Sequence, residues 1–385
     1  YGMGVSMDDI KNFRQWGAKT PGHPEYGHTP GVETTTGPLG MGVANAVGMA
    51  MAEAHLAAVF NKPGYPIVDH YTYVMTGDGC LMEGISAEAS SLAGTLKLGK
   101  LILLYDKNNI TIEGDTDTAF TEDVAKRYEA YGWQVLTVDD ANTDVDAIDR
   151  AIAEAKKETE KPSMIICNTT IGYGCAPVAG TAGCHGSPIG EENLKVLRET
   201  LGVTEAPFTV PQEVYDAAKE QTDRSAAAEE TWKKMFAEYA EKYPEMAKLY
   251  DQYMSKVDTA VFDEEFYRFD GAMATRQSSG TVLNRLAAKV PQLMGGSADL
   301  APSNNSLMKE REYFSADNYA GSNIHFGIRE FAMSAIANGM YLHGGVIPYA
   351  ATFFVFSDYL KHGIRLSALM KLPTIYIMTH DSIGV

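Results

Sequence analysis

Two stretches in the first third of the chain carry acidic, amide and glycine residues in an order that suits a metal ion and a phosphate. Gly77-Asp78-Gly79 follows one short apolar run, and Asn108-Asn109 follows the next. Because ligands of open α/β sheets bind beyond the carboxyl ends of strands, we expect Asp78 and Asn108 to lie close together. A carboxylate, an amide oxygen and a backbone carbonyl are hard oxygen ligands, and diphosphate oxygens and a water would complete an octahedron around Mg²⁺. The sequence therefore predicts a site for magnesium and a diphosphate.

The glycines on both sides of Asp78 support this prediction, because they let a phosphate approach the backbone closely. A helix expected to begin near residues 81–83 would direct its N–H groups to the same place. A simple turn after a strand explains Gly77-Asp78-Gly79 at least equally well when that tripeptide is taken alone. The second polar strand end, at Asn108, favours the metal and diphosphate interpretation.

The elements that must position these residues follow a regular rhythm. Residues 1–200 alternate apolar runs with helical patterns, which is typical of a parallel sheet covered on both faces. Residues 201–270 are rich in charge and alanine, and we interpret them as a helical linker with a solvated helix at 225–243. The α/β rhythm resumes at residue 271. Strands are expected at 71–75, 101–105, 134–138, 164–167, 292–295, 346–352 and 374–378, and helices at 84–98, 123–131, 145–158, 281–290, 330–342 and 353–370.

Composition narrows the class of protein. The 385 residues include 32 Lys and Arg against 50 Asp and Glu, a net charge of −18, which argues against nucleic-acid binding. No stretch is expected to span a membrane, because the most apolar candidate, residues 41–60, is interrupted by Asn45, Glu53 and His55. No signal peptide is expected at the N-terminus. Four cysteines without a CxxC pair indicate free thiols in a reducing cytoplasm.

A set of short motifs, spread over almost the whole chain, makes it resemble the transketolase family of thiamine diphosphate-dependent enzymes. The motifs occur in family order at residues 20–25 (TPGHPE), 35–40 (TTGPLG), 77–84 (GDGCLMEG), 106–115, 185–188 (HGSP), 274–276 (ATR), 296–300 (GSADL), 327–330 (GIRE) and 379–384 (THDSIG). The resemblance implies an α/β fold with two doubly wound, parallel-sheet domains that bind thiamine diphosphate. Residues 1–200 would form the diphosphate- and magnesium-binding domain, 201–270 the helical linker and 271–385 an incomplete pyrimidine-binding domain. Relatives extend beyond both ends, so the chain is expected to be truncated.

The resemblance also implies a reaction: transfer of a two-carbon ketol unit from a ketose phosphate to an aldose phosphate, in the pentose phosphate pathway. Glu330 would hydrogen-bond the aminopyrimidine ring of the cofactor and activate it. Catalytic roles are implied for Glu330, His23, His185 and His380. Metal ligation is implied for Asp78, Asn108 and Ile110, with Mg²⁺ as the ion and Ca²⁺ as a substitute. Cofactor contacts are implied for Gly37, Leu39, Gly79, Glu83, Asn108, His185, Asp299, Glu330, Phe353, Phe356 and Tyr359. Substrate contacts are implied for His23, His185, Arg276, Ser303 and His380.

Three aromatic residues carry a second prediction about the pyrimidine ring. Phe353, Phe356 and Tyr359 are spaced i, i+3 and i+6, so they are expected on one face of one helix. Spacing of this kind is more often a core stripe than a cofactor pocket. The resemblance favours contact with the ring, which aromatic stacking would provide.

The resemblance further implies a C2 homodimer, in which Asp78 and Glu330 of one active site come from different subunits. Glu83 would be a buried carboxylate at the subunit interface. Two alternatives remain open. One is another thiamine-dependent ketol synthase, and the other is a relative that binds the cofactor without activity. The partners expected are sugar phosphates and a second copy of the chain, with no nucleic acid and no membrane.

Overall fold

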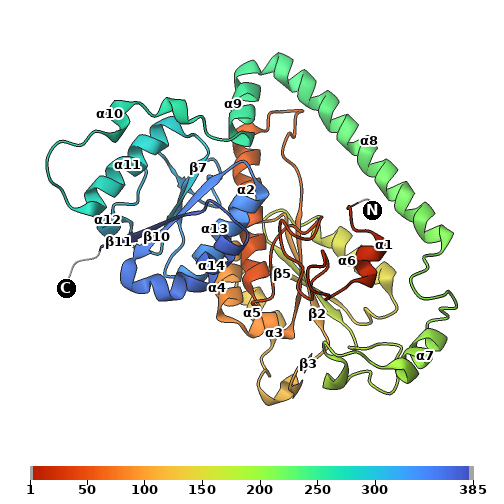
Figure 1. Cartoon of the computed structure of the whole chain (residues 1–385). Coiled ribbons are helices and arrows are strands. Elements are labelled where there is room, and N and C mark those ends of the chain that lie inside the picture. The colour runs from red at the N-terminus through yellow and green to blue at the C-terminus, as the bar shows by residue number, and fades with distance from the viewer. Residues whose placement is uncertain (1–2, 381–385) are drawn as a thin grey trace. The chain divides into compact units, whose positions relative to one another are not determined.

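The structure, a computed structural model, describes residues 3–380 and forms two compact units (Figure 1). The first unit takes the residues up to Gly42 together with Tyr73–Ala87 and Gly99–Glu230. The second takes Val43–Thr72, Glu88–Leu98 and the residues from Thr231 onward. Each unit is therefore built from separate stretches of chain. The predicted domain boundaries at residues 200 and 270 stay a prediction.

The first unit is organised around a four-stranded sheet in the order β1-β2-β6-β5. The strands are β1 (Thr72–Gly77), β2 (Leu101–Lys107), β5 (Gln134–Val138) and β6 (Ser163–Asn168). β2 and β5 each pair in parallel with β6. β6 is buried over its first five residues, as expected of an apolar strand covered on both faces. Helices α5 (Val124–Ala130) and α6 (Val145–Ala155) pack on these strands, each begun by an Asp side-chain cap.

The same unit carries several shorter elements. They are α1 (Met7–Lys11), α3 (Asp78–Met82), the hairpin β3 (Ile110–Thr111) and β4 (Gly114–Asp115), η1 (Thr116–Thr118), η2 (Ala182–Cys184) and α7 (Glu191–Thr200). α4 (Gly84–Thr95) follows α3. The prediction that a helix begins near residues 81–83 was wrong: α3 begins at Asp78 itself, and α4 begins at Gly84.

The second unit contains a five-stranded sheet in the order β11-β10-β7-β9-β8, in which every neighbouring pair is parallel. Its strands are β7 (Leu293–Ser297), β8 (Tyr313–Phe314), β9 (Asn323–His325), β10 (Ile347–Phe353) and β11 (Ile375–Thr379). Its helices include α9 (Pro244–Met254), η3 (Thr259–Val261), α10 (Glu264–Tyr267), α11 (Thr275–Lys289), α12 (Ala301–Asn304), α13 (Glu330–His343), η4 (Phe354–Phe356) and α14 (Ser357–Leu369). α13 packs against β10 and α14, and its residues from Ala332 to Met340 are all buried.

The long helix α2 (Met41–Phe60) lies largely in the second unit and is buried along most of its length. Gly48 packs so closely on α13 that a Cβ there would lie 2.0 Å from the carbonyl oxygen of Ile336. Among the described residues, α2 is the helix that is long and apolar enough to cross a membrane, which the sequence analysis had not expected. However, 72% of its most apolar 18-residue window is buried inside the protein, as in the core helix of a globular fold.

Two further expectations need correction. The predicted helix at 225–243 is the end of a longer one, α8 (Gln212–Lys242), which Figure 1 shows as the long green helix. The helix predicted over residues 353–370 is present only from Ser357 to Leu369, as α14, so its predicted start was wrong. Phe353 ends β10, Phe356 lies in η4 and only Tyr359 lies in α14, so the three aromatic residues do not share one helix face.

Candidate functional site

Asp78 lies at the carboxyl end of β1, as the first residue of α3, and is buried. Its Oδ1 accepts a hydrogen bond of 2.5 Å from the hydroxyl of Tyr105 on β2. Its Oδ2 accepts from the backbone N–H groups of Asn108 and Asn109, at 3.3 and 3.0 Å. Burial and the bond to Asp78 raise the pKa of the Tyr105 phenol, so this hydroxyl remains a donor. The two predicted strand ends therefore meet, as the sequence implied.

Asn108 is oriented by its own set of contacts. Its Nδ2 lies 3.5 Å from Oδ2 of Asp106, and its Oδ1 accepts from the backbone N–H of Ile110 at 3.1 Å. The hydroxyl of Thr169, which follows β6, donates to the other oxygen of Asp106. Asn109 has a positive φ of 59°, which turns the chain from β2 into the β3–β4 hairpin. This turn carries Ile110 beside Asn108.

The donor set at this edge fits a small, hard cation. It offers one buried carboxylate, one amide oxygen and backbone carbonyls, all of them oxygen ligands, on neighbouring strands. Within residues 3–380 no group of three or more His, Cys, Asp or Glu side chains is placed to hold a metal. A site with a single carboxylate needs ligands from a bound anion, as a magnesium–diphosphate site does.

Two glycines flank Asp78, and a third, Gly37, lies in the loop that carries Leu39. A Cβ on Gly77 would meet nothing within 4 Å, and one on Gly79 would lie 3.1 Å from a methyl of Leu39. Gly37 has φ of +117°, a conformation that side chains rarely adopt, and its Cα faces the His23 ring, which a Cβ would approach to 3.8 Å. The structure therefore brings Gly37, Leu39 and Gly79 together with His23. An open backbone of this kind suits the close approach of a phosphate.

His23 and His185 line one open cleft of about 1230 Å³ in the first unit, together with Arg14, His28 and Ile112. Both predicted histidines are exposed to this cleft. His185 follows the short helix η2, so it is carried by a loop far along the chain from His23.

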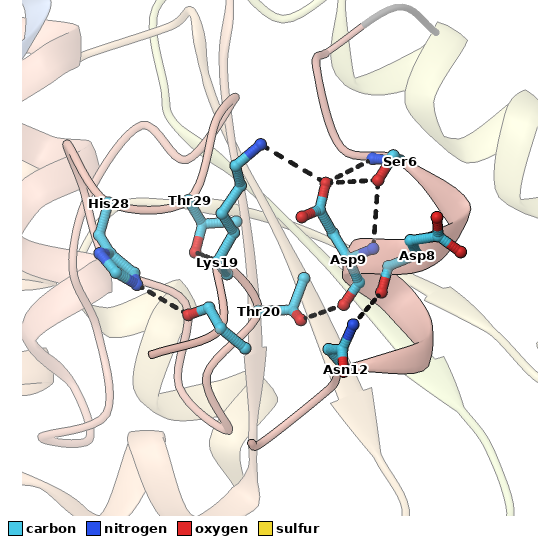
Figure 2. A network of polar contacts seen from close by, with 9 residues as sticks. Ser6, Asp8, Asp9, Asn12, Lys19, Thr20, His28 and Thr29 are labelled. Carbon is cyan, nitrogen blue, oxygen red and sulfur yellow. Dashed lines mark hydrogen bonds and ion pairs between the residues drawn. The ribbon is translucent and has the colours of Figure 1, made fainter. Parts of the chain in front are cut away.

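A network of polar contacts holds the loop that carries His23 (Figure 2). Ser6 and Asp9 cap α1 reciprocally, and Asp9 also lies 3.6 Å from the ammonium of Lys19. The Thr20 hydroxyl donates to the carbonyl of Asp9 at 2.6 Å, and the Thr29 hydroxyl donates to that of Lys19, also at 2.6 Å. The hydrogen bonds of Ser6 lower the pKa of the Asp9 carboxyl. Residues before and after His23 are thereby tied to α1.

In the second unit, four predicted residues gather at the carboxyl edge of the sheet. Asp299 follows β7 with a φ of 60°, Phe353 ends β10 and His380 follows β11. The rings of Phe353 and His380 meet edge to face at 4.8 Å, and Phe353 stacks with Phe356 at 6.1 Å. The four residues share this edge because β7, β10 and β11 are parallel neighbours. Residues 381–384 of the last motif lie outside the described residues.

Arg276, Ser303 and His380, predicted to bind substrate, also lie together. Nη1 of Arg276 donates to the backbone carbonyl of Ser303 at 3.2 Å and lies 3.4 Å from Nδ1 of His380. The guanidinium is only partly buried, and no carboxylate forms an ion pair with it among the described residues. A guanidinium with spare donors suits a phosphate.

Glu330 is the first residue of α13 and follows β9 through a short loop. In that loop the Arg329 guanidinium donates to the carbonyl of Phe326 and to the hydroxyl of Ser91. Glu83, expected to be buried, is exposed. Tyr359 is likewise 60% exposed.

The sequence analysis missed two residues that contact the predicted site. Tyr105 touches Asp78, and Glu88 accepts a hydrogen bond from the first turn of α13. A signal existed for Tyr105, since a tyrosine in a buried strand must find a partner for its hydroxyl. Glu88 carried no such signal, because its partner is a backbone group 244 residues away.

Two protein-family models together match almost the whole chain. The family model described as "Transketolase, thiamine diphosphate binding domain" matches residues 1–258, and "Transketolase, pyrimidine binding domain" matches residues 271–385. The chain is 54% identical to a transketolase of Halalkalibacterium halodurans over 387 residues, covering 100% of this chain and 58% of that protein. It is 53% identical to a transketolase of Nostoc sp. over 384 residues, covering 99% of this chain and 57% of that protein. The chain thus spans just under three fifths of the length of these curated relatives.

Solved structures of transketolases also superpose closely on this chain. A transketolase from Leishmania mexicana superposes with a TM-score of 0.95 at 44% identity, covering 100% of this chain and 57% of that one. A Pichia stipitis transketolase in complex with sedoheptulose 7-phosphate superposes with a TM-score of 0.94 at 44% identity, covering 100% of this chain and 58% of that one. The predicted α/β fold is confirmed. With both family domains matched along its length and its polar strand ends assembled as described, the chain belongs to the transketolase family and contains that family's thiamine diphosphate-binding and pyrimidine-binding domains.

Proposed function

We propose that this protein is a thiamine diphosphate- and Mg²⁺-dependent transketolase, which moves a two-carbon ketol unit from a ketose phosphate to an aldose phosphate. The observation that carries the proposal is the match to transketolases, which extends over the whole chain and both of its units. The family relation supports a place in the pentose phosphate pathway. Four free cysteines support a cytoplasmic location.

In the first unit, Asp78, Asn108 and the carbonyl of Ile110 would hold Mg²⁺ against the diphosphate. Gly37, Leu39 and Gly79 would line the diphosphate, where the open backbone at Gly77 and Gly79 leaves room for it. His23 and His185 would bind sugar hydroxyls and move protons, because both face the same cleft. The proposed cofactor contacts of Glu83 and Asp299 have less support. Both residues are exposed, and within the described part of the chain neither forms a hydrogen bond with another predicted site residue.

In the second unit, Glu330 would hold a proton on the aminopyrimidine ring, and Phe353, Phe356 and Tyr359 would surround that ring. Thiamine diphosphate, when bound, supplies the electron sink for breaking the carbon–carbon bond. Arg276 and Ser303 would bind the substrate phosphate, and the adjacent His380 would contact the sugar.

The test is ketol transfer from xylulose 5-phosphate to ribose 5-phosphate by the intact protein with thiamine diphosphate and Mg²⁺, beside Glu330→Ala. Removing a group that transfers protons is expected to lower kcat by roughly 10²- to 10⁴-fold. An intact protein that binds the cofactor but transfers no ketol unit would contradict the proposal. That result would point instead to an inactive relative or to a ketol synthase with another acceptor.

We further propose a homodimer as the working unit. Apolar side chains near the carboxyl edge of the second unit's sheet are exposed in the single chain, which a second copy would cover: Ile328 is 77% exposed, Phe354 51% and Val355 69%. Mixing inactive Asp78→Asn and Glu330→Gln subunits tests whether one site uses both chains. A shared site predicts recovery of about a quarter of wild-type activity in a random mixture, since one site of each mixed dimer is intact. Sites contained within single chains predict no recovery.

A further inference from the structure

A second open cavity, of about 950 Å³, lies in the second unit between α11 and the segment that runs from α12 to Lys309. Two of its lining side chains, Arg285 and Lys309, are cations, and no Asp or Glu of the described chain lines it. The whole chain carries a net charge of −18, so this cavity differs in charge from the protein as a whole. A hollow lined by one sign of charge attracts small molecules of the opposite sign.

The guanidinium of Arg285 is fixed at one wall of this cavity. Its Nη1 donates to the backbone carbonyl of Phe266 at 2.7 Å, and its central carbon lies 4.8 Å from the ring centroid of Phe269. The bond to Phe266 uses one of the five N–H groups of the side chain, and no carboxylate forms an ion pair with it among residues 3–380. A fixed guanidinium with spare donors suits the oxygens of a phosphate.

Lys309 is held beside α11 by Asn284. The Asn284 side chain donates to the carbonyls of Gly280 and Leu307, at 2.9 and 3.1 Å. It also accepts a hydrogen bond of 2.8 Å from the backbone N–H of Lys309. Lys309 itself is exposed, and its side chain forms no ion pair or hydrogen bond within the described part of the chain. Its ammonium is therefore available to an anion.

The two segments that enclose the cavity also meet at Gly280. A Cβ on Gly280 would lie 2.8 Å from the Cβ of Asn305 and 2.8 Å from its carbonyl oxygen, so a glycine is needed for this approach. Asn305 ends α12 with a positive φ of 55°. Close packing of this kind keeps the cavity in shape without a ligand, which lowers the entropic cost of binding one.

We infer that this cavity is a binding site for a phosphorylated small molecule, whose phosphate is bound by Arg285 and Lys309. The amide side chains of Gln277 and Asn305 also line the cavity and would hydrogen-bond hydroxyl groups of the same molecule. The volume lies within the range of small-molecule sites, roughly 300–1,000 Å³. The inference goes beyond the proposed ketol transfer and does not depend on it.

This site is distinct from the proposed substrate phosphate site, because neither Arg276 nor Ser303 lines the cavity. On α11, Arg276 and Arg285 are 285 − 276 = 9 positions apart, which is about two and a half turns, so they leave opposite faces of the helix. The Arg276 guanidinium reaches Ser303 and His380. That of Arg285 reaches Phe266, in α10. The two arginines can therefore be tested separately.

The experiment titrates the intact protein, saturated with thiamine diphosphate and Mg²⁺, with glycerol 3-phosphate and follows binding by saturation-transfer difference NMR. This probe carries a phosphate on a small polar body and is neither a ketose nor an aldose, so the proposed reaction does not consume it. Arg276→Gln serves as the background, because it weakens the proposed substrate phosphate site. Saturable binding is expected in this background, whereas glycerol without a phosphate should not bind.

Two substitutions test the phosphate ligands. In the Arg276→Gln background, Arg285→Gln and Lys309→Gln should each raise the Kd of glycerol 3-phosphate by about 10- to 100-fold, as expected for loss of a hydrogen bond to a charged group. Arg268→Gln is the matched control, since this exposed arginine pairs with Glu265 and does not line the cavity. It should keep the Kd of the background.

Absence of saturable binding in the background would overturn the inference, and so would an unchanged Kd in Lys309→Gln. The lysine variant decides the outcome if Arg285→Gln does not fold, because the exposed Lys309 side chain holds no other group within residues 3–380. Binding that Arg276→Gln abolishes would belong to the proposed substrate site alone.

Failure of this inference is distinguishable from failure of the proposed function. A protein that transfers no ketol unit but binds glycerol 3-phosphate through Arg285 and Lys309 would contradict the proposed activity and support this site. An active transketolase whose glycerol 3-phosphate binding is insensitive to both substitutions would support the proposed activity and overturn the inference.

Discussion

The carboxylate of Glu88 accepts a 2.9 Å hydrogen bond from the backbone N–H of Ala332, the third residue of α13. The first N–H groups of a helix have no partner within the helix, so Glu88 satisfies one of them from a distant part of the chain. Burial raises the pKa of the Glu88 carboxyl, and the charge of Glu330 adds to that rise. Glu88 therefore stabilises the end of the helix at which Glu330 lies.

Glu88→Ala should lower the free energy of unfolding by about 0.5–2 kcal/mol, because it leaves a helix N-terminus without its side-chain acceptor. Glu88→Gln should lose less, since the amide oxygen can still accept from Ala332. Urea denaturation measures both. Glu192→Ala, which removes an exposed carboxylate that pairs with Lys195, serves as the control and should change stability by less than about 0.5 kcal/mol. Equal stability of Glu88→Ala and the wild type would contradict this assignment.

Metal removal should be visible without an activity assay. Ligands that bind the folded state stabilise it by about 2.7 kcal/mol at 100 times Kd, so thiamine diphosphate with Mg²⁺ should raise the melting temperature. Adding a chelator should abolish the rise. Asp78→Asn should show no rise at all, whereas Asp146→Asn, an exposed aspartate on α6, should match the wild type. A full cofactor-dependent rise in Asp78→Asn would exclude Asp78 as the ligand.

Arg276→Gln should raise KM for phosphorylated sugars by about 10- to 100-fold, since a hydrogen bond to a charged group contributes about 1.5–3 kcal/mol. Its kcat should change little, because the guanidinium would bind the phosphate and not the reacting carbons. KM for the corresponding sugar without a phosphate should stay the same. Arg268→Gln, at an exposed arginine that pairs with Glu265, is the control. A fall in kcat with KM unchanged would place Arg276 elsewhere in the mechanism.

Stability should fall as the pH drops below about 6.5. Burial lowers the pKa of His343 from its ordinary 6.5, and the nearby His70 lowers it further, while the carbonyl of Gly344 and the charge of Glu53 oppose the shift. The unfolded chain then takes up a proton at a higher pH than the native one, so acid favours unfolding. Burial lowers the pKa of His55 in the same direction.

His343→Asn should therefore lose less melting temperature than the wild type between pH 7.5 and 5.5. His28→Asn, at an exposed histidine, is the control and should keep the wild-type dependence. Thermal melts at a series of pH values measure the difference. A His343→Asn curve as steep as that of the wild type would show that another group is responsible.

Gly48→Ala should cost about 3 kcal/mol or more of folding free energy, because the added methyl would lie 2.0 Å from the Ile336 carbonyl oxygen. Neither backbone can move away easily, since both belong to buried helices. Gly84→Ala places a methyl where nothing lies within 4 Å and should be neutral or slightly stabilising. Denaturant titration of the two variants gives the comparison. A Gly48→Ala protein as stable as the wild type would show that the helices separate readily.

The strand ends were predictable because the apolar runs and the polar residues that follow them indicated the same positions. β5 has the predicted bounds, and Asp78 and Asn108 meet because their strands are neighbours. The aromatic residues were not predictable from spacing: β10 continues to Phe353 because it pairs with β7 and β11, and this pairing overrides a helical pattern in the sequence. Glu88 could not be predicted because its partner is set by a tertiary contact, whereas the buried Tyr105 indicated a hydrogen-bond partner without indicating which one.

The contact between Gly48 and Ile336 also has a consequence for synthesis on the ribosome. The two residues are 336 − 48 = 288 positions apart, so α2 emerges long before the helix that covers it. At about 5–20 residues per second, this interval lasts roughly 15 to 60 s. During that time a 20-residue apolar helix has no completed core to enter. Nascent chains of this protein should consequently depend on chaperones that shield apolar segments, and should aggregate when translation stalls between α2 and α13.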